Sequence, residues 1–125
     1  MREVGVVIDL EGAPLYWHVP PSRTAVTLPD SRALWDVLWE HRDRVAGFAH
    51  SHPGSGVPAP SHEDVTTFSA LERGLGRRYD WWIATRDGFV VCRWSGPGPL
   101  DYRTERCDAE PTWVSRLRAL SEEEE

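Results

Sequence analysis

The sequence predicts a single domain of the α/β class (α+β type), in which a mixed β-sheet is flanked by helices. Three observations predict it. The 125-residue chain is 40% hydrophobic and contains seven Trp residues, so it can bury one core without disulfide bonds. Short segments rich in Val and Ile alternate with segments of helical periodicity. The chain has no internal repeat and no linker long enough to divide it.

A β-hairpin is predicted near the N-terminus. Residues 3–10 are rich in Val and Ile, a Gly-Ala-Pro turn at 12–14 interrupts them, and residues 15–19 resume an extended pattern with aromatic side chains. A third short strand is predicted at 25–28, immediately before Pro29. Three extended segments are therefore expected before the first helix.

The first helix is predicted over residues 32–44. Asp30 and Ser31 are favourable N-cap residues, because their side chains can accept hydrogen bonds from the first helical N–H groups. The apolar residues that recur at helical spacing are Leu34, Trp35, Val37, Leu38, Trp39 and Val45. Charged residues occupy the other face, so this helix is expected to pack on the sheet.

A strand, a loop and a helix are predicted in succession in the middle of the chain. Residues 45–50 form a short apolar segment that ends abruptly at the Ser-His-Pro sequence of 51–53. Residues 54–60 are rich in Gly, Pro and Ser, and a helix is expected from 61 to about 73, ending at Gly74. The strand therefore delivers two histidines to the start of a loop.

The last third of the chain predicts a second hairpin and a closing helix. Strands are expected at 80–85 and 89–94, joined by an Arg-Asp-Gly turn at 86–88. A further strand is predicted around Tyr102 and a helix over 112–120.

Charge and composition restrict the partners and the compartment. The formal charge is −6, with a run of four Glu at 122–125, so we expect a domain over 1–120, an acidic disordered tail over 121–125 and no nucleic-acid partner. Cys92 and Cys107 lack a metal-type or redox-type spacing, and no segment resembles a signal peptide or a membrane span. A cytoplasmic protein with reduced thiols, not bound to a membrane, is expected.

Three side chains could converge on one metal ion. His50 and His52 stand two residues apart near a strand end, so both imidazoles are expected on one side of the sheet. A catalytic zinc site takes three protein ligands, and Asp64 in the first turn of the following helix can supply the third. Ser61-x-x-Asp64 also has the form of a helix capping box, which is the structural alternative for these two residues.

The motif is more specific when it is taken as a whole. The His-Ser-His-Pro segment 50–53, the short loop and the Pro-Ser-x-x-Asp segment 60–64 together resemble the JAMM signature of the JAB/MPN (Mov34/MPN/PAD-1) metalloprotease family, whose fold is cytidine-deaminase-like. The order of the predicted elements is similar to that fold over most of the chain. Eight residues separate His52 from Ser61 where the family usually has seven, and the extra residue is expected to bulge at 54–56.

The resemblance implies one Zn²⁺ per chain, bound by His50, His52 and Asp64. It also implies that Ser61 stabilises an oxyanion and that an upstream Glu activates water. Glu3 is preferred for this role, since Glu-Val-Gly-Val-Val at residues 3–7 looks like the start of the family's first strand.

Two other upstream carboxylates remain alternatives to Glu3. Glu11 lies in a predicted turn, where a solvated carboxylate is the default interpretation. Glu40 lies among other charges on a predicted helix.

The function implied by the resemblance is zinc-dependent hydrolysis of a peptide or isopeptide bond in a protein or peptide substrate. A ubiquitin-like or sulfur-carrier protein, cut at its C-terminal Gly, is the expected substrate class. The alternative is a catalytically inactive MPN-type scaffold that binds protein. An amidohydrolase would need a barrel of about 250 residues, and a zinc deaminase a Pro-Cys-x-x-Cys element that the chain lacks. The natural substrate and the oligomeric state stay open.

Overall fold

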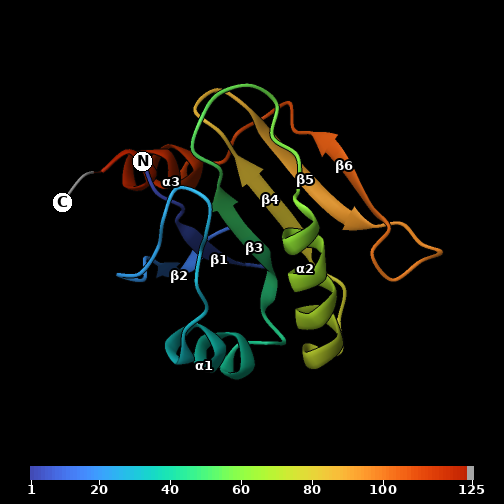
Figure 1. Cartoon of the computed structure of the whole chain (residues 1–125). Helices are drawn as coiled ribbons and strands as arrows, with labels where there is room; N and C mark the ends of the chain where they lie inside the picture. The colour runs from blue at the N-terminus through green and yellow to red at the C-terminus, as the bar shows by residue number, and fades with distance from the viewer. Residues whose placement is uncertain (124–125) are drawn as a thin grey trace.

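The computed structural model describes residues 1–123, and residues 124–125 of the expected acidic tail lie outside the described part. The chain forms a six-stranded mixed sheet and three helices in one small domain (Figure 1), which confirms the predicted mixed α/β class. In chain order the elements are β1 (Gly5–Asp9), β2 (Pro14–His18), α1 (Arg32–Glu40), β3 (Val45–Ser51), α2 (His62–Leu75), β4 (Asp80–Ala84), β5 (Phe89–Trp94), β6 (Tyr102–Arg106) and α3 (Trp113–Glu122).

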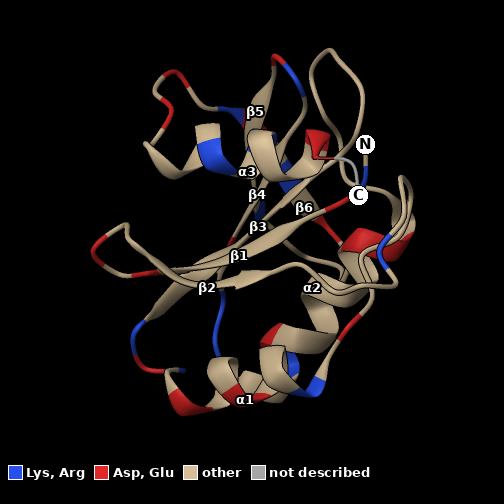
Figure 2. Ribbon diagram, turned by 90° about the vertical axis from the view of Figure 1, so that its left-hand side faces the viewer, with Lys and Arg blue, Asp and Glu red and all other residues tan. Residues whose placement is uncertain are grey.

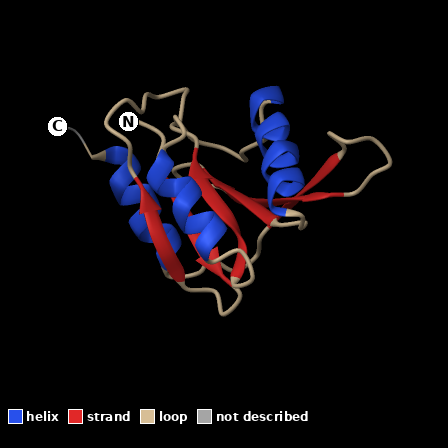
Figure 3. Cartoon of the chain, turned by 90° about the horizontal axis from the view of Figure 1, so that it is seen from below, coloured by secondary structure: helices blue, strands red, loops and turns tan. Residues whose placement is uncertain are grey.

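The sheet has the strand order β2-β1-β3-β4-β5-β6. Only β3 and β4 are parallel, because α2 forms the crossover between them, and every other neighbouring pair is antiparallel. Both predicted hairpins, β1–β2 and β4–β5, are therefore confirmed. At one edge the β5–β6 pair extends beyond the helices (Figure 3).

Helices cover both faces of the sheet. Figure 2 shows α1 and α2 on one side and α3 on the other. Side chains of β1 alternate between two cores, because Val7 packs in the cluster with α1 and α2 whereas Val6 and Ile8 pack in the cluster with α3. All five residues of β1 are buried, as expected for a central strand covered on both faces.

Gly47 sets the distance between β3 and β4. A Cβ atom at this position would lie 1.8 Å from the Asp80 carbonyl oxygen, so only Gly allows the two backbones to pair in this register. The pairing places the end of β3, and the histidine that follows it, beside the end of β4.

A buried carboxylate joins α2 to the strands behind it. Glu72 accepts hydrogen bonds from the Tyr79 N–H, the Trp81 indole N–H and the Arg78 guanidinium, each at 2.9 Å, and also from the Tyr102 hydroxyl. The charge of this buried group is thus met by four donors, one of them cationic.

Three predictions in the first half of the chain are wrong. Residues 25–28 form no strand, because the Thr24 N–H donates to the Thr27 carbonyl and closes a local turn instead of pairing with the sheet. Helix α1 ends at Glu40 and not at residue 44 as expected. The residues after Glu40 form a tighter turn. Trp35 and Trp39 were expected on the packed face, but they are 37% and 55% exposed, and the buried residues of α1 are the two leucines.

Two helix ends also differ from the prediction. Helix α2 continues past Gly74 and stops at Gly76, which has φ of 72° and donates its N–H to the Glu72 carbonyl. Gly favours this left-handed conformation at a helix C-terminus. Helix α3 extends to Glu122, two residues into the expected tail, because Ser121 is buried and its hydroxyl donates to the Arg2 carbonyl at 2.8 Å. Within residues 1–123 no helix combines the length and the apolar character needed to cross a membrane.

Candidate metal centre

The two histidines of the motif meet at the end of β3. His50 is the sixth residue of β3 and is only 4% exposed, whereas His52 follows the strand and is half-buried. The His52 N–H donates to the Ala84 carbonyl at 2.9 Å, which ties this position to the end of β4. The two Nε2 atoms lie 3.0 Å apart, so both rings direct a nitrogen at the same small region.

Asp64 brings a carboxylate to the same region from the first turn of α2. Its Oδ2 lies 3.0 Å from His52 Nε2, and its Oδ1 lies 3.4 Å from His50 Nε2. Oδ2 also accepts the Ser61 N–H at 2.9 Å, while Ser61 Oγ accepts the Asp64 N–H at 3.0 Å. The capping box is therefore present, and it holds Asp64 so that the carboxylate still faces both histidines.

These three donors match the size of a tetrahedral metal site. Bonds of about 2.0 to 2.1 Å to zinc require donor atoms about 3.3 to 3.4 Å apart. The Nε2 atoms of His50 and His52 lie 3.0 Å apart, Asp64 Oδ2 lies 3.0 Å from His52 Nε2, and Asp64 Oδ1 lies 3.4 Å from His50 Nε2. Each of these separations is within a few tenths of an ångström of the spacing that zinc requires. Two imidazoles and one carboxylate are a donor set that suits zinc.

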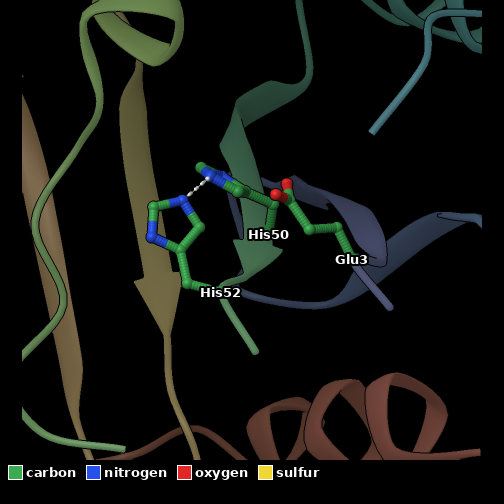
Figure 4. Close-up of side chains that lie close together, drawn as sticks. All are labelled: Glu3, His50 and His52. Carbon is green, nitrogen blue, oxygen red and sulfur yellow. Dashed lines mark hydrogen bonds between the residues drawn. The ribbon is translucent and has the colours of Figure 1, made fainter. Parts of the chain in front are cut away.

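Glu3 adds a second carboxylate to the histidine pair. One oxygen of Glu3 and one nitrogen each of His50 and His52 all lie within 4.8 Å of one another (Figure 4). This group could hold a metal ion. Two overlapping donor sets thus share the histidines, one completed by Asp64 and the other by Glu3.

Backbone hydrogen bonds fix Glu3 although it precedes the first strand. The Glu3 N–H donates to the Thr24 carbonyl at 2.8 Å, and the next N–H, of Val4, donates to Ser51 Oγ at 3.0 Å. Ser51 returns its own N–H to the Val4 carbonyl at 2.9 Å. Glu3 is therefore held beside the end of β3 with only 7% of its surface exposed.

The pKa values of the Glu3 and Asp64 carboxyl groups are shifted in opposite directions. Burial raises the pKa of Glu3 to about 7, against a smaller lowering by His52, while the charges of Asp64 and Glu63 add to the rise. Burial also acts to raise the pKa of Asp64, but hydrogen bonds from both histidines and from the Ser61 N–H hold it far below its ordinary range. Asp64 is thus a permanent anion, whereas Glu3 exchanges its proton near neutral pH.

The two imidazoles also differ. Complete burial lowers the pKa of His50 in spite of the hydrogen bond to Asp64. For His52, burial is outweighed by the hydrogen bond and charge of Asp64 and by the charge of Glu3, so its pKa is raised. A neutral His50 keeps a lone pair on one ring nitrogen, which is the form that binds a metal.

A pocket of about 670 Å³ opens from this centre and continues between α1 and α2. Ser61 lies on its wall, and its Oγ accepts only the capping N–H, so the hydroxyl proton can be donated into the pocket. Of the alternatives to Glu3, Glu11 lies in the β1–β2 turn and Glu40 at the end of α1, and neither lines this pocket.

The long loop between His52 and Ser61 is anchored on the β4–β5 turn. Gly54 and Gly56 have φ of 122° and 91°, as a sharp change of direction requires. The Arg86 N–H donates to the Gly54 carbonyl at 2.8 Å, and the Gly56 N–H donates to Asp87 Oδ1 at 2.6 Å. The loop is thus held beside this turn, and Asp64 reaches both histidines.

Two features of the site were not found from the sequence. The segment 25–30 lines the pocket, although a strand was expected over most of it. His18, at the end of β2, is buried in the pocket wall with its Nε2 2.6 Å from the Pro29 carbonyl. The isolated position of His18 in the sequence gave no signal for this contact.

Comparison with known proteins adds no relative. No protein-family model matches the chain, and no curated protein matches it either. The resemblance to the JAB/MPN family therefore stays a prediction from the sequence motif.

Proposed function

We propose that the protein is a zinc-dependent peptidase or isopeptidase of the JAB/MPN type. The observation that carries the proposal is the convergence of His50, His52 and Asp64 to within 3.4 Å of one another, with the Glu3 carboxyl against the same histidines. A separate ligand set, a proton acceptor and a pocket for substrate are the parts that metal-assisted hydrolysis needs.

In this proposal His50, His52 and Asp64 hold the ion. Zinc, when bound, supplies Lewis acidity that polarises a carbonyl group and makes water acidic enough to attack near neutral pH. The capping box keeps one Asp64 oxygen on the Ser61 N–H, so the other oxygen is the natural ligand atom.

Glu3 is the general base of the proposal. It takes the proton of the attacking water and delivers it to the leaving amine, and a pKa of about 7 suits both steps. Ser61 donates its hydroxyl hydrogen to the oxyanion of the tetrahedral intermediate, since capping uses only the acceptor side of its oxygen.

The proposed substrate is a protein or peptide, with a ubiquitin-like or sulfur-carrier protein cut at its C-terminal Gly as the first class to test. In the described part of the chain, the residues that line the pocket include no Lys or Arg and provide four carboxylates, from Glu3, Asp30, Glu63 and Asp64. An anionic nucleic-acid substrate is incompatible with this charge.

Metal analysis tests the ligand assignment directly. About one zinc per chain is expected in the wild type, with loss of zinc in His52→Ala and Asp64→Ala. His62→Ala is the matched control, because His62 is an exposed residue of the same segment that does not line the pocket. Wild-type protein that takes up no zinc when it is supplied would refute the hydrolase and favour the protein-binding scaffold.

Activity tests the role of Glu3. Glu3→Gln is expected to keep its zinc and to lose turnover of Gly-tailed fusion substrates. Loss of zinc in Glu3→Gln would instead show that Glu3 is a ligand.

A further inference from the structure

The pocket extends well beyond the metal centre into a space with apolar walls, here called the apolar compartment. The residues that define it are Leu28, Leu34, Leu38, Phe48, Phe68 and Leu71. They come from the segment before α1, from α1, from β3 and from α2. The compartment therefore lies between the two helices that Figure 2 shows on one side of the sheet.

Packing in the core fixes the walls of the apolar compartment. Leu34, Leu38 and Phe68 are buried members of the core cluster on this face. The Phe48 ring lies across Gly5, where a Cβ atom would be 2.3 Å from its Cζ and 3.1 Å from a Leu28 methyl carbon. Since these side chains are held by the core, the compartment is formed before any ligand arrives.

The mouth of the apolar compartment is open and apolar. On the α2 side it is lined by Thr67 and Ala70, two small exposed residues that leave the space free. On the other side lie Val26, 81% exposed, and Trp35, 37% exposed. Apolar surface of this extent beside a candidate site marks a place where a ligand covers it.

Charge selects the kind of side chain that can enter. Among residues 1–123, those that line the pocket include four carboxylates and no Lys or Arg, so like charge would oppose an acidic side chain. Asp30 is already engaged, because it accepts the Trp35 indole N–H at 2.7 Å. Charge therefore disfavours an acidic group, and the six apolar side chains of the walls favour a neutral apolar group over a cationic one, whose charge they would desolvate.

We infer that the apolar compartment is the subsite for a bulky, uncharged apolar side chain, such as Leu or Phe, next to the bond that is cleaved. The inference rests on the proposed hydrolytic function and adds a substrate requirement to it. A chain of glycine alone would leave most of the approximately 670 Å³ pocket unfilled. Burial of a Leu or Phe side chain is therefore the main source of selectivity in this compartment.

Binding tests the subsite without catalysis. The tetrapeptides Gly-Gly-Leu-Gly, Gly-Gly-Gly-Gly and Gly-Gly-Asp-Gly are titrated into the full chain in EDTA, and methyl NMR signals of Leu28, Leu34 and Leu71 are followed. We expect saturable shifts with the Leu peptide and affinity on the order of 10- to 100-fold above the Gly and Asp peptides. Equal affinity for the three peptides would overturn the inference, whatever the zinc content of the protein.

Filling the apolar compartment gives a second test. Ala70→Phe places a ring at its mouth, and Ala70→Leu is a smaller version in case the ring disturbs folding. The matched control is Ala33→Phe, on the exposed face of α1 and outside the pocket lining. Both Ala70 variants should lose the preference for the Leu peptide, whereas Ala33→Phe should keep it. An unchanged preference in folded Ala70 variants would refute the subsite.

Kinetics connects the subsite to the proposed reaction. Two substrate series vary the residue before or after the scissile bond from Gly to Leu, and kcat/KM is expected to rise on the order of 10- to 100-fold in one of them. If the protein binds the Leu peptide as expected but holds no zinc and cleaves nothing, the proposed function fails while the binding subsite stands. If zinc-dependent cleavage is observed but Leu has no effect in either series, the proposed function stands and the subsite is refuted.

Discussion

Replacing Glu3 with Gln should stabilise the metal-free protein at neutral and alkaline pH. Glu3 is buried, and its carboxylate is harder to ionise in the folded protein than in the unfolded chain, since burial raises its pKa from 4.5 to about 7. Gln has nearly the same shape and carries no charge. The substitution therefore removes the cost of ionising a buried group and little else.

The two pKa values, 4.5 in the unfolded chain and about 7 in the folded protein, determine how Glu3 changes the free energy of unfolding with pH. Below pH 4.5 the carboxyl is protonated in both states, and Glu3 imposes no electrostatic cost on folding. As the pH rises from 4.5 through about 7, the unfolded chain loses its proton first and the folded state loses stability. Above pH 7 the cost reaches about 3 kcal/mol, because each tenfold difference in proton affinity corresponds to about 1.4 kcal/mol.

Urea unfolding in EDTA measures this effect between pH 4 and pH 8.5. The free energy of unfolding of Glu3→Gln should approach that of wild type at pH 4 and exceed it by about 3 kcal/mol at pH 8. Glu11→Gln, in an exposed turn, is the control and should show no such trend. Added zinc should narrow the difference, since a nearby cation favours the ionised Glu3. A stability difference that stays constant with pH would refute the reasoning.

Three further substitutions test other parts of the structure. Gly47→Ala would place a methyl group against a β4 carbonyl oxygen and should cost at least about 3 kcal/mol in urea unfolding. Gly74→Ala within α2 would place its methyl group 3.6 Å from Trp35 Cη2, an ordinary van der Waals contact, and should gain up to about 1 kcal/mol. Glu72→Ala leaves four donors without their acceptor and should cost about 3 to 5 kcal/mol, against almost none for the exposed Glu40→Ala. Ser61→Ala should cost about 1 kcal/mol through loss of the cap. If the proposed mechanism holds, the same variant should retain zinc and turn over about 100- to 1,000-fold more slowly.

The local part of the candidate site could be predicted from the sequence. His50, His52 and Asp64 lie within 15 residues of one another, so a single strand, one loop and one helix start determine how they meet. Strand periodicity and helix capping are local rules, and both hold here. The position of Glu3 depends instead on pairing with distant segments, and the sequence left three carboxylates open for that reason.

The rest of the pocket depends on packing that a local pattern does not encode. Residues 25–28 have the composition of a strand, but Leu28 and Phe48 both lie over Gly5, and the backbone closes a local turn from Thr24 to Thr27. On α1 the apolar residues cover more of the helix surface than the sheet can bury. Periodicity alone therefore could not tell that Leu34 and Leu38 would be buried while the two tryptophans stay exposed.

The position of Glu3 depends on an element from the opposite face of the sheet. Ser121 in α3 donates its hydroxyl to the Arg2 carbonyl, and the Arg2 N–H donates to the Ser121 carbonyl at 2.9 Å. One residue further, Glu3 is tied to Thr24 in the segment that borders the pocket. The proposed metal ligands come from the end of β3, the residue after it and α2, and they take part in neither contact. Weakening the α3 attachment should therefore displace the proposed base while leaving the ion in place, so base positioning and metal binding are separable in this fold.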